Sequence, residues 1–218
     1  MMKNLLVSLL LFITYLNAGQ PKDSVYLEGT QESALILLHG KGKNPTWKVV
    51  DPLRKSINEK LGFHTISLQM PTAGDNFRDY EEHFSEAYST IQEAIKFLEE
   101  KNIKNIYLFG HSMGSRMASA FIAENGNGSI KGLILAGCRN NGGGVLSCSN
   151  NVEMIDIPVL DVWGTKNNKD TKAASQREHF VSDKYTQKSI GNANHVFDGY
   201  DSSLSDIVID WIGKNKNN

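Results

Sequence analysis

The chain has 218 residues, of which 40% are hydrophobic and 22% charged, an ordinary composition for a folded domain. This length is enough for one domain with a full hydrophobic core and short for two. The formal net charge of −1 leaves no basic surplus of the kind that nucleic-acid binding requires, so no nucleic-acid partner is expected.

The N-terminus has the layout of a secretory signal peptide. A positive start that includes Lys3 precedes the mostly apolar stretch 5–16, and Ala18 offers a cleavage site. The apolar stretch is short for a permanent membrane span, although an uncleaved anchor is the alternative interpretation. We therefore expect a signal peptide over 1–18, a single domain over 19–218, export to the periplasm or the medium, and no membrane span after cleavage.

Strand-like and helix-like segments alternate through the rest of the chain. Continuous apolar runs indicate strands buried on both faces, whereas apolar residues at steps of three and four indicate helices packed on a sheet. Strands are predicted at 34–38, 63–68, 106–109, 132–136, 157–163 and 185–190, and helices at 51–61, 77–101, 113–124, 172–181 and 202–212. This alternation predicts an α/β fold with a mostly parallel central sheet flanked by helices, without a substantial lid.

A Gly-x-Ser-x-Gly motif lies between an expected strand and an expected helix, in Gly110-His111-Ser112-Met113-Gly114. A strand–turn–helix is the setting in which such a serine is held in a strained turn with its hydroxyl exposed above the sheet. The free N–H groups at the start of the next helix suit a developing negative charge. Ser112 is therefore the candidate nucleophile, and the alternative is a helix cap without chemistry.

Three motifs together resemble the α/β-hydrolase superfamily, in its small lid-free esterase and dienelactone-hydrolase-like form. They are Leu38-His39-Gly40, the serine turn and Asn194-His195, and the resemblance extends over about 34–212. The segment 157–164 also looks like the acid-bearing strand of that fold. The chain is similar to exported bacterial members whose substrates are unassigned. The resemblance implies an oxyanion hole made by the backbone N–H groups of Lys41 and Met113.

The base and the acid follow from the chain order serine, acid, histidine. His195 lies after the last expected strand and before the last expected helix, so it is the candidate base, while His39 is expected to be structural. The usual acid position, three residues after Gly164, holds Asn167. We rank Asp161 first, because an isolated carboxylate in a buried strand needs a partner, Asp170 second, and Asn167 third as a neutral acceptor, with Asp156 and Asp198 as weaker options.

Two cysteines, Cys138 and Cys148, flank the glycine-rich stretch 142–144. In an oxidising compartment we expect them to form a disulfide, with free thiols as the alternative. Two cysteines without a nearby histidine pair are too few ligands for a structural zinc, so no metal site is expected.

The predicted function is that of a serine hydrolase acting on a carboxylester or related acyl bond, without a cofactor. The short loops predict an open site and a small or surface-accessible acyl substrate, and the sequence gives no signal for an oligomeric state. The alternative is a catalytically weak or inactive α/β-hydrolase-fold binding protein of the cell envelope, because no carboxylate occupies position 167.

Overall fold

A single seven-stranded sheet forms the centre of the molecule in the computed structural model, which describes residues 18–216. The strands are β1 (Val25–Leu27), β2 (Ser33–Leu38), β3 (His64–Leu68), β4 (Asn105–His111), β5 (Ile130–Ala136), β6 (Val159–Gly164) and β7 (Tyr185–Ile190). Their order across the sheet is β1-β3-β2-β4-β5-β6-β7. Only β1 runs antiparallel to its neighbour, so the predicted α/β fold with a mostly parallel sheet is confirmed.

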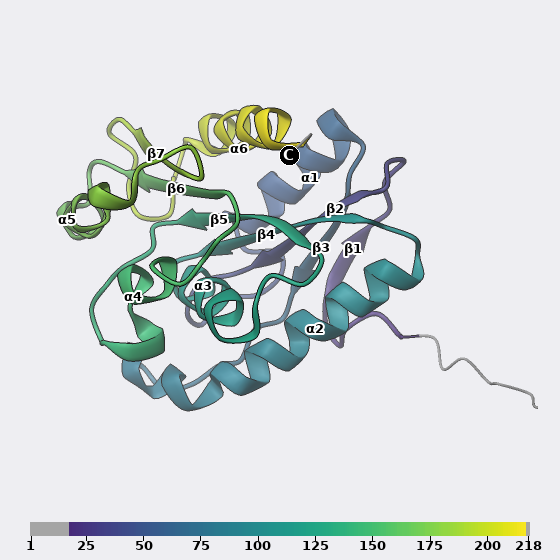
Figure 1. Ribbon diagram of the computed structural model, residues 1–218, viewed down its shortest axis with the longest axis horizontal. Helices are drawn as coiled ribbons and strands as arrows, with labels where there is room; N and C mark the ends of the chain where they lie inside the picture. Colours follow the sequence, from purple (N-terminus) through teal and green to yellow (C-terminus); the bar gives the residue numbers. More distant parts are fainter. Residues whose placement is uncertain (1–17, 217–218) are drawn as a thin grey trace, which may run out of the picture.

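Helices cover both faces of this sheet, as Figure 1 shows. The α-helices are α1 (Val50–Leu61), α2 (Phe84–Glu100), α3 (Met113–Asn125), α4 (Cys148–Val152), α5 (Asn168–Gln176) and α6 (Asp201–Asn215). Three short 3₁₀ helices are η1 (Phe77–His83), η2 (Gly144–Leu146) and η3 (Glu178–Phe180). Helices α1 and α6 lie on one face, and α2 and α3 lie on the other.

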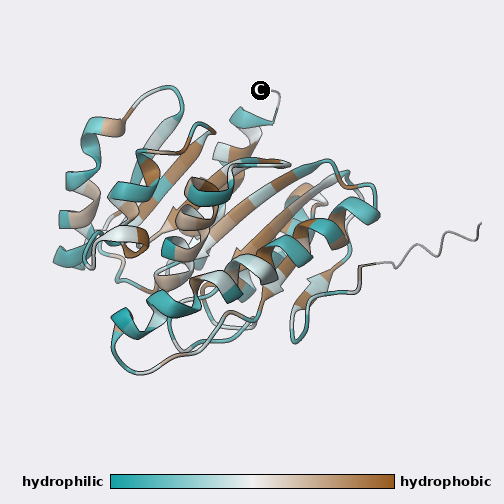
Figure 2. Cartoon of the chain, turned by 60° about the horizontal axis from the view of Figure 1, so that its bottom comes forward, coloured by the Kyte–Doolittle hydropathy of each residue, from teal (hydrophilic) through white to brown (hydrophobic). Residues whose placement is uncertain are grey.

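Hydrophobic burial on both faces explains why the central strands are continuous apolar runs. All six residues of β2 are buried, and β4 is buried from Ile106 onward. Side chains from α1 and α6 such as Leu53 and Val208 pack on one face, while Ile91 and Met117 from α2 and α3 pack on the other. Figure 2 shows this pattern as hydrophobic strands beneath helices whose outer sides are hydrophilic.

Two of the predicted helices differ from those observed. The segment predicted as one helix over 77–101 consists of the 3₁₀ helix η1, which a capping box of Asn76 and Asp79 starts, followed by α2 from Phe84. The helix predicted over 172–181 begins four residues earlier, where the side chain of Asn167 caps α5. The short elements β1 and α4 carry little periodicity and were not predicted.

The topology brings the ends of distant segments to one edge of the sheet. Because β2, β4, β5, β6 and β7 run parallel, the loops that follow them lie at the same edge.

The predicted signal peptide, apart from Ala18, lies outside the described residues. Within 18–216, no helix is both long and apolar enough to cross a membrane.

Candidate active site

Ser112 occupies the sharp turn between β4 and α3. Its backbone has φ 56° and ψ −110°, a conformation that residues other than glycine rarely adopt. The turn is held by a hydrogen bond of 2.8 Å from the Ser112 N–H to the Ala136 carbonyl on the neighbouring strand. A strained serine at the end of a central strand is the local geometry that the sequence motif predicts.

The two glycines of the motif allow the strand and the helix to approach this closely. A Cβ atom at Gly110 would lie 2.4 Å from the Gly114 carbonyl oxygen, and one at Gly114 would lie 2.4 Å from the Leu38 carbonyl oxygen. Both contacts are with backbone atoms, so a side chain at either position would force the turn apart.

A chain of hydrogen bonds runs from Ser112 through His195 to Asp170. The Ser112 hydroxyl oxygen lies 2.9 Å from His195 Nε2, and His195 Nδ1 lies 2.7 Å from Asp170 Oδ2. The Asp170 carboxylate can only accept at neutral pH, so the ring proton is on Nδ1 and Nε2 is left to accept the serine proton. The geometry thus places a hydroxyl, an imidazole and a carboxylate in the order of contacts that a nucleophile, a base and an orienting acid require.

Asp161, ranked first as the acid, is not in contact with His195. It is fully buried on β6, where its carboxylate accepts hydrogen bonds from Arg177, Tyr185 and Gln187 at 2.8 to 3.1 Å. These fixed donors occupy both of its oxygen atoms. The ranking was therefore wrong: the partner that a buried charge requires is Arg177, and Asp161 has a structural role.

Asn167, ranked third, is the N-cap of α5. Its side-chain oxygen accepts from the backbone N–H groups of Lys169 at 2.9 Å and Asp170 at 3.4 Å. Asn167 thereby fixes the start of the helix whose first turn carries Asp170. The spacing Asn167-x-x-Asp170 is that of a capping box, and this signal could have identified the start of the helix from the sequence.

Asp170 has a second partner that the sequence interpretation missed. Arg139 Nε donates to Asp170 Oδ1 at 2.7 Å, so Arg139 and His195 share the carboxylate. Burial raises the pKa of Asp170, but the interactions with His195 and then Arg139 outweigh it and hold the pKa below its ordinary value of 3.8. The carboxylate therefore stays ionised at neutral pH, as an orienting acid must.

Two further histidines, His111 and His39, hydrogen-bond backbone groups of the loops around the site. His111 Nε2 bonds the backbone carbonyl of His195 at 2.9 Å, and burial followed by the proximity of His195 lowers the pKa of His111 to about 3. His111 is therefore a neutral donor that holds the His195 loop. His39 is buried, accepts from the Met70 N–H at 3.0 Å and bonds the Gly40 carbonyl at 2.9 Å, which fits its predicted structural role.

A small cavity of about 150 Å³ opens beside Ser112. Lys41 and Met113, the two residues predicted to form an oxyanion hole, both line it. Within 18–216, neither of their backbone N–H groups donates a hydrogen bond to the protein. Free N–H groups at the edge of a cavity that contains a serine hydroxyl are suited to bind a carbonyl oxygen that becomes negative.

The predicted disulfide between Cys138 and Cys148 is present. It closes the loop that carries Arg139, and Arg177 Nη1 donates to the Cys138 carbonyl at 3.1 Å. The disulfide therefore restricts the segment that holds Asp170 in place. Among the described residues, no group of three histidine, cysteine or acidic side chains is arranged to bind a metal ion.

The arrangement of strands and helices matches solved α/β hydrolases. Est1E from Butyrivibrio proteoclasticus, in a structure with bound ferulic acid, superposes with a TM-score of 0.72 at 15% identity, covering 89% of this chain and 95% of that chain. Dienelactone hydrolase from Anabaena variabilis gives a TM-score of 0.71 at 15% identity, covering 88% and 91%. An α/β serine hydrolase without a lid from Xanthomonas campestris gives 0.66 at 14% identity, covering 89% and 95%. The chain therefore has the α/β-hydrolase fold.

Sequence comparison gives a family but no characterised relative. No curated protein sequence matches the chain. Residues 75–195, which are more than half of the 218, match the family described as "Protein of unknown function (DUF3530)". The chain therefore belongs to the DUF3530 family.

Proposed function

We propose that this protein is a serine hydrolase that cleaves a carboxylester or a related acyl bond such as a thioester. The observation that carries the proposal is the continuous contact from Ser112 Oγ to His195 Nε2 at 2.9 Å and from His195 Nδ1 to Asp170 Oδ2 at 2.7 Å. The three side chains come from β4–α3, the loop after β7 and the first turn of α5, and local packing alone gives no reason for them to meet. Hydrolases in the fold comparison add support at the level of the fold.

The first half of the reaction forms an acyl-enzyme. His195 Nε2 takes the hydroxyl proton as Ser112 Oγ bonds to the carbonyl carbon, and the carbonyl oxygen becomes an oxyanion beside the N–H groups of Lys41 and Met113. Asp170 stabilises the imidazolium that forms. When the bond to the leaving group breaks, His195 returns the proton to the departing oxygen or sulfur atom.

The second half releases the acid. His195 takes a proton from water as the water oxygen bonds to the acyl carbon, and the bond to Ser112 Oγ then breaks. The proton held by His195 passes to Ser112, so the enzyme regains its starting state. Water and the ester are consumed, and one acid and one alcohol or thiol are formed.

We further propose that the protein works outside the cytoplasm. The Cys138–Cys148 disulfide supports this, because disulfides persist in oxidising compartments and are rare where thiols are kept reduced. The signal-peptide pattern over 1–18 points the same way.

The test is labelling by a fluorophosphonate probe together with hydrolysis of para-nitrophenyl acetate. Wild-type protein should be labelled and active, while Ser112→Ala should lose labelling and about 10⁴-fold or more in kcat/KM. Ser89→Ala, which removes an exposed serine hydroxyl on α2, is the matched control and should keep both. If the folded wild type is neither labelled nor active near neutral pH, the alternative of a binding protein replaces the hydrolase.

A further inference from the structure

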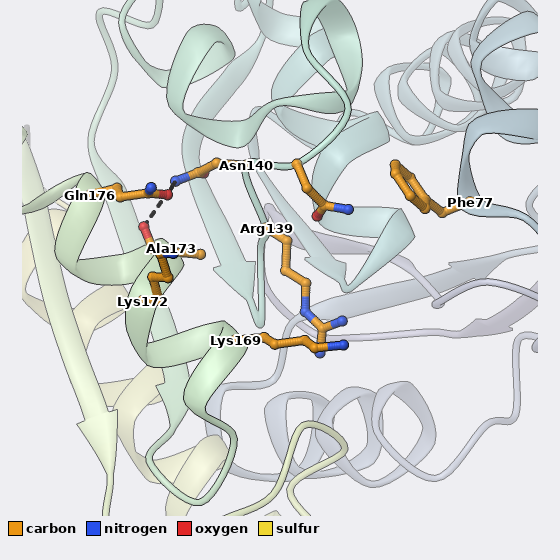
Figure 3. Close-up of a pocket in the computed structure, with 8 residues that line it drawn as sticks. Phe77, Arg139, Asn140, Lys169, Lys172, Ala173 and Gln176 are labelled. Carbon is orange, nitrogen blue, oxygen red and sulfur yellow. Dashed lines mark hydrogen bonds between the residues drawn. The ribbon is translucent and has the colours of Figure 1, made fainter.

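A larger cavity adjoins the one at Ser112. It has a volume of about 620 Å³ and lies between α5 and Phe77, as Figure 3 shows. Phe77, Arg139 and Asn141 line both cavities, so the two spaces share a wall of three residues. A molecule whose reacting carbonyl lies at Ser112 therefore has room to extend into the larger cavity.

The charges on the wall of this larger cavity are all positive. Arg139, Lys169 and Lys172 line it together with neutral side chains, and no aspartate or glutamate is among its lining residues. In Figure 3 the side chains of Arg139 and Lys169 extend toward the same region. Neither lysine forms an ion pair within residues 18–216, and the carboxylate that binds Arg139 is fully buried and shared with His195.

The position of the lysines is electrostatically unfavourable for the protein alone. Lys169 lies in the first turn of α5, where the helix dipole disfavours a positive charge, and Lys172 follows one turn later on the same helix. Both lysines are exposed, so water weakens the repulsion between them, and an anion bound between them would replace that repulsion by attraction. The positive charges on this wall therefore favour the state with an anion in the cavity over the state without one.

A buried cation extends the positive field to Ser112. Arg116 lines the smaller cavity, is 5% exposed and, within 18–216, its side chain hydrogen-bonds only the carbonyl oxygens of Asn141 and Leu146 and the side-chain oxygen of Asn141. No carboxylate pairs with it among the described residues. Burial and then the nearby Arg139 lower the pKa of Arg116 to about 10, which still leaves it charged at neutral pH.

We propose that the larger cavity is an anion subsite, so that the substrate carries a carboxylate or phosphate group that lies against Arg139, Lys169 and Lys172 while its scissile carbonyl lies at Ser112. The inference deepens the proposed hydrolase function and rests on it for the role of Ser112. The amide side chains of Asn141 and Gln176 on the same wall can donate further hydrogen bonds to oxyanions, whereas the amide of Asn140 already donates to the Ala173 carbonyl and to the Gln176 side-chain oxygen. Acidic acyl compounds are thus the substrate class, and neutral esters of the same length are poorer substrates.

A pair of esters that differ only in charge tests the subsite. Para-nitrophenyl glutarate ends in a free carboxylate, and its methyl ester is nearly the same shape without the charge. Wild type should have a kcat/KM about tenfold higher for the charged ester, and this preference should fall as the salt concentration rises. A third ester that ends in phosphate at the same distance tells which of the two oxyanions is preferred.

Charge-removing variants assign the preference to the cavity. Lys169→Met and Lys172→Met should each lower the charged-to-neutral ratio by about twofold to fivefold, and the double variant should bring it close to one, with little change for the neutral ester. Lys188→Met is the matched control, because it removes the same charge from an exposed position on β7 that lines neither cavity. It should keep the wild-type ratio.

Binding to Ser112→Ala separates this proposal from the hydrolase proposal. Calorimetry at low salt should detect binding of monomethyl glutarate and none of dimethyl glutarate, and the double lysine variant should abolish it. An equal response to the charged and neutral compounds, or a preference that survives loss of both lysines, overturns the anion subsite. If wild type is neither labelled nor active but the protein still binds monomethyl glutarate, only the hydrolase proposal is overturned and the anion subsite stands.

Discussion

Two aspartates with fully buried side chains, Asp161 and Asp170, differ in how exposed their hydrogen-bonding partners are. Asp161 pairs with Arg177, whose side chain is 1% exposed, so the cation that binds it is enclosed as well. Asp170 pairs with Arg139 and His195, whose side chains are 27% and 22% exposed. Burial and an arginine partner are thus common to both residues. A buried carboxylate can influence a bound substrate only when one of its partners is also exposed to the cavity where the substrate would lie.

The difference between the two aspartates follows from where each lies on its element. Asp161 is in the middle of a central strand, where its neighbours are fixed by the sheet register. Asp170 is in the first turn of α5, at the edge of the sheet where the loops gather. The first position suits a structural anchor and the second suits a site.

Asp170→Asn should have the largest effect on activity. The amide cannot hold the Nδ1 proton as a carboxylate does, so kcat for para-nitrophenyl acetate should fall on the order of 10³ to 10⁴-fold. Its cost in the free energy of unfolding should be only about 1 to 3 kcal/mol, because Arg139 and His195 are partly exposed and water can solvate the charge that loses its partner. Steady-state kinetics and urea unfolding measure the two effects. Retention of near wild-type kcat would remove Asp170 from the mechanism.

Asp161→Asn should produce the opposite pattern. The change leaves the Arg177 charge buried without a counter-charge, which should cost about 3 to 5 kcal/mol in the free energy of unfolding. The molecules that remain folded should keep kcat within about tenfold of wild type, because Asp161 does not contact His195. Urea unfolding and active-site titration with the fluorophosphonate probe measure both quantities. A stable but inactive Asp161→Asn would return Asp161 to the candidate triad.

These two residues also mark the limit of what the sequence could predict. Ser112 and His195 could be named as candidates because their signals are local: a glycine-flanked turn, and a position between the last strand and the last helix. The carboxylate that contacts His195 depends on where α5 begins, and placing that helix four residues late hid the capping relation of Asn167 to Asp170. Arg139 is separated from Asp170 along the chain by η2, α4 and β6, so only the folded chain brings them together.

The disulfide loop connects the two aspartate pairs, because Cys138 accepts from Arg177 and the next residue, Arg139, binds Asp170. Replacing both cysteines by serine should lower the free energy of unfolding by about 3 kcal/mol, the loop-entropy value for this separation. Activity should fall less than in Asp170→Asn, since Arg116 still holds the loop through Asn141 and Leu146. Thermal unfolding with and without a reductant measures the loss, and the double serine variant should not respond to the reductant.

Arg139→Gln gives the smallest and most specific effect. Asp170 keeps His195 but loses a charged donor, so kcat for the neutral ester should fall about tenfold, much less than in Asp170→Asn. Because its partners lower the folded-state pKa of Asp170, the carboxylate stabilises the fold above its ordinary pKa of 3.8, and this contribution is lost as the pH falls through the lowered value. Without Arg139 the folded pKa rises toward 3.8.

Because the pKa of Asp170 is lowered in the folded state, the effect of Arg139→Gln on stability should depend on pH in a defined direction. When the pH is lowered from about 5 to about 3, the free energy of unfolding should fall more for wild type than for Arg139→Gln. Only in wild type does ionised Asp170 contribute the full stabilisation that protonation removes. The stability difference between the two proteins should therefore be largest above about pH 4 and shrink below it. Arg78→Gln, an exposed arginine without an ion pair among residues 18–216, is the control and should follow wild type throughout. A constant difference at all pH values would mean that Arg139 acts on Asp170 by packing and not by charge.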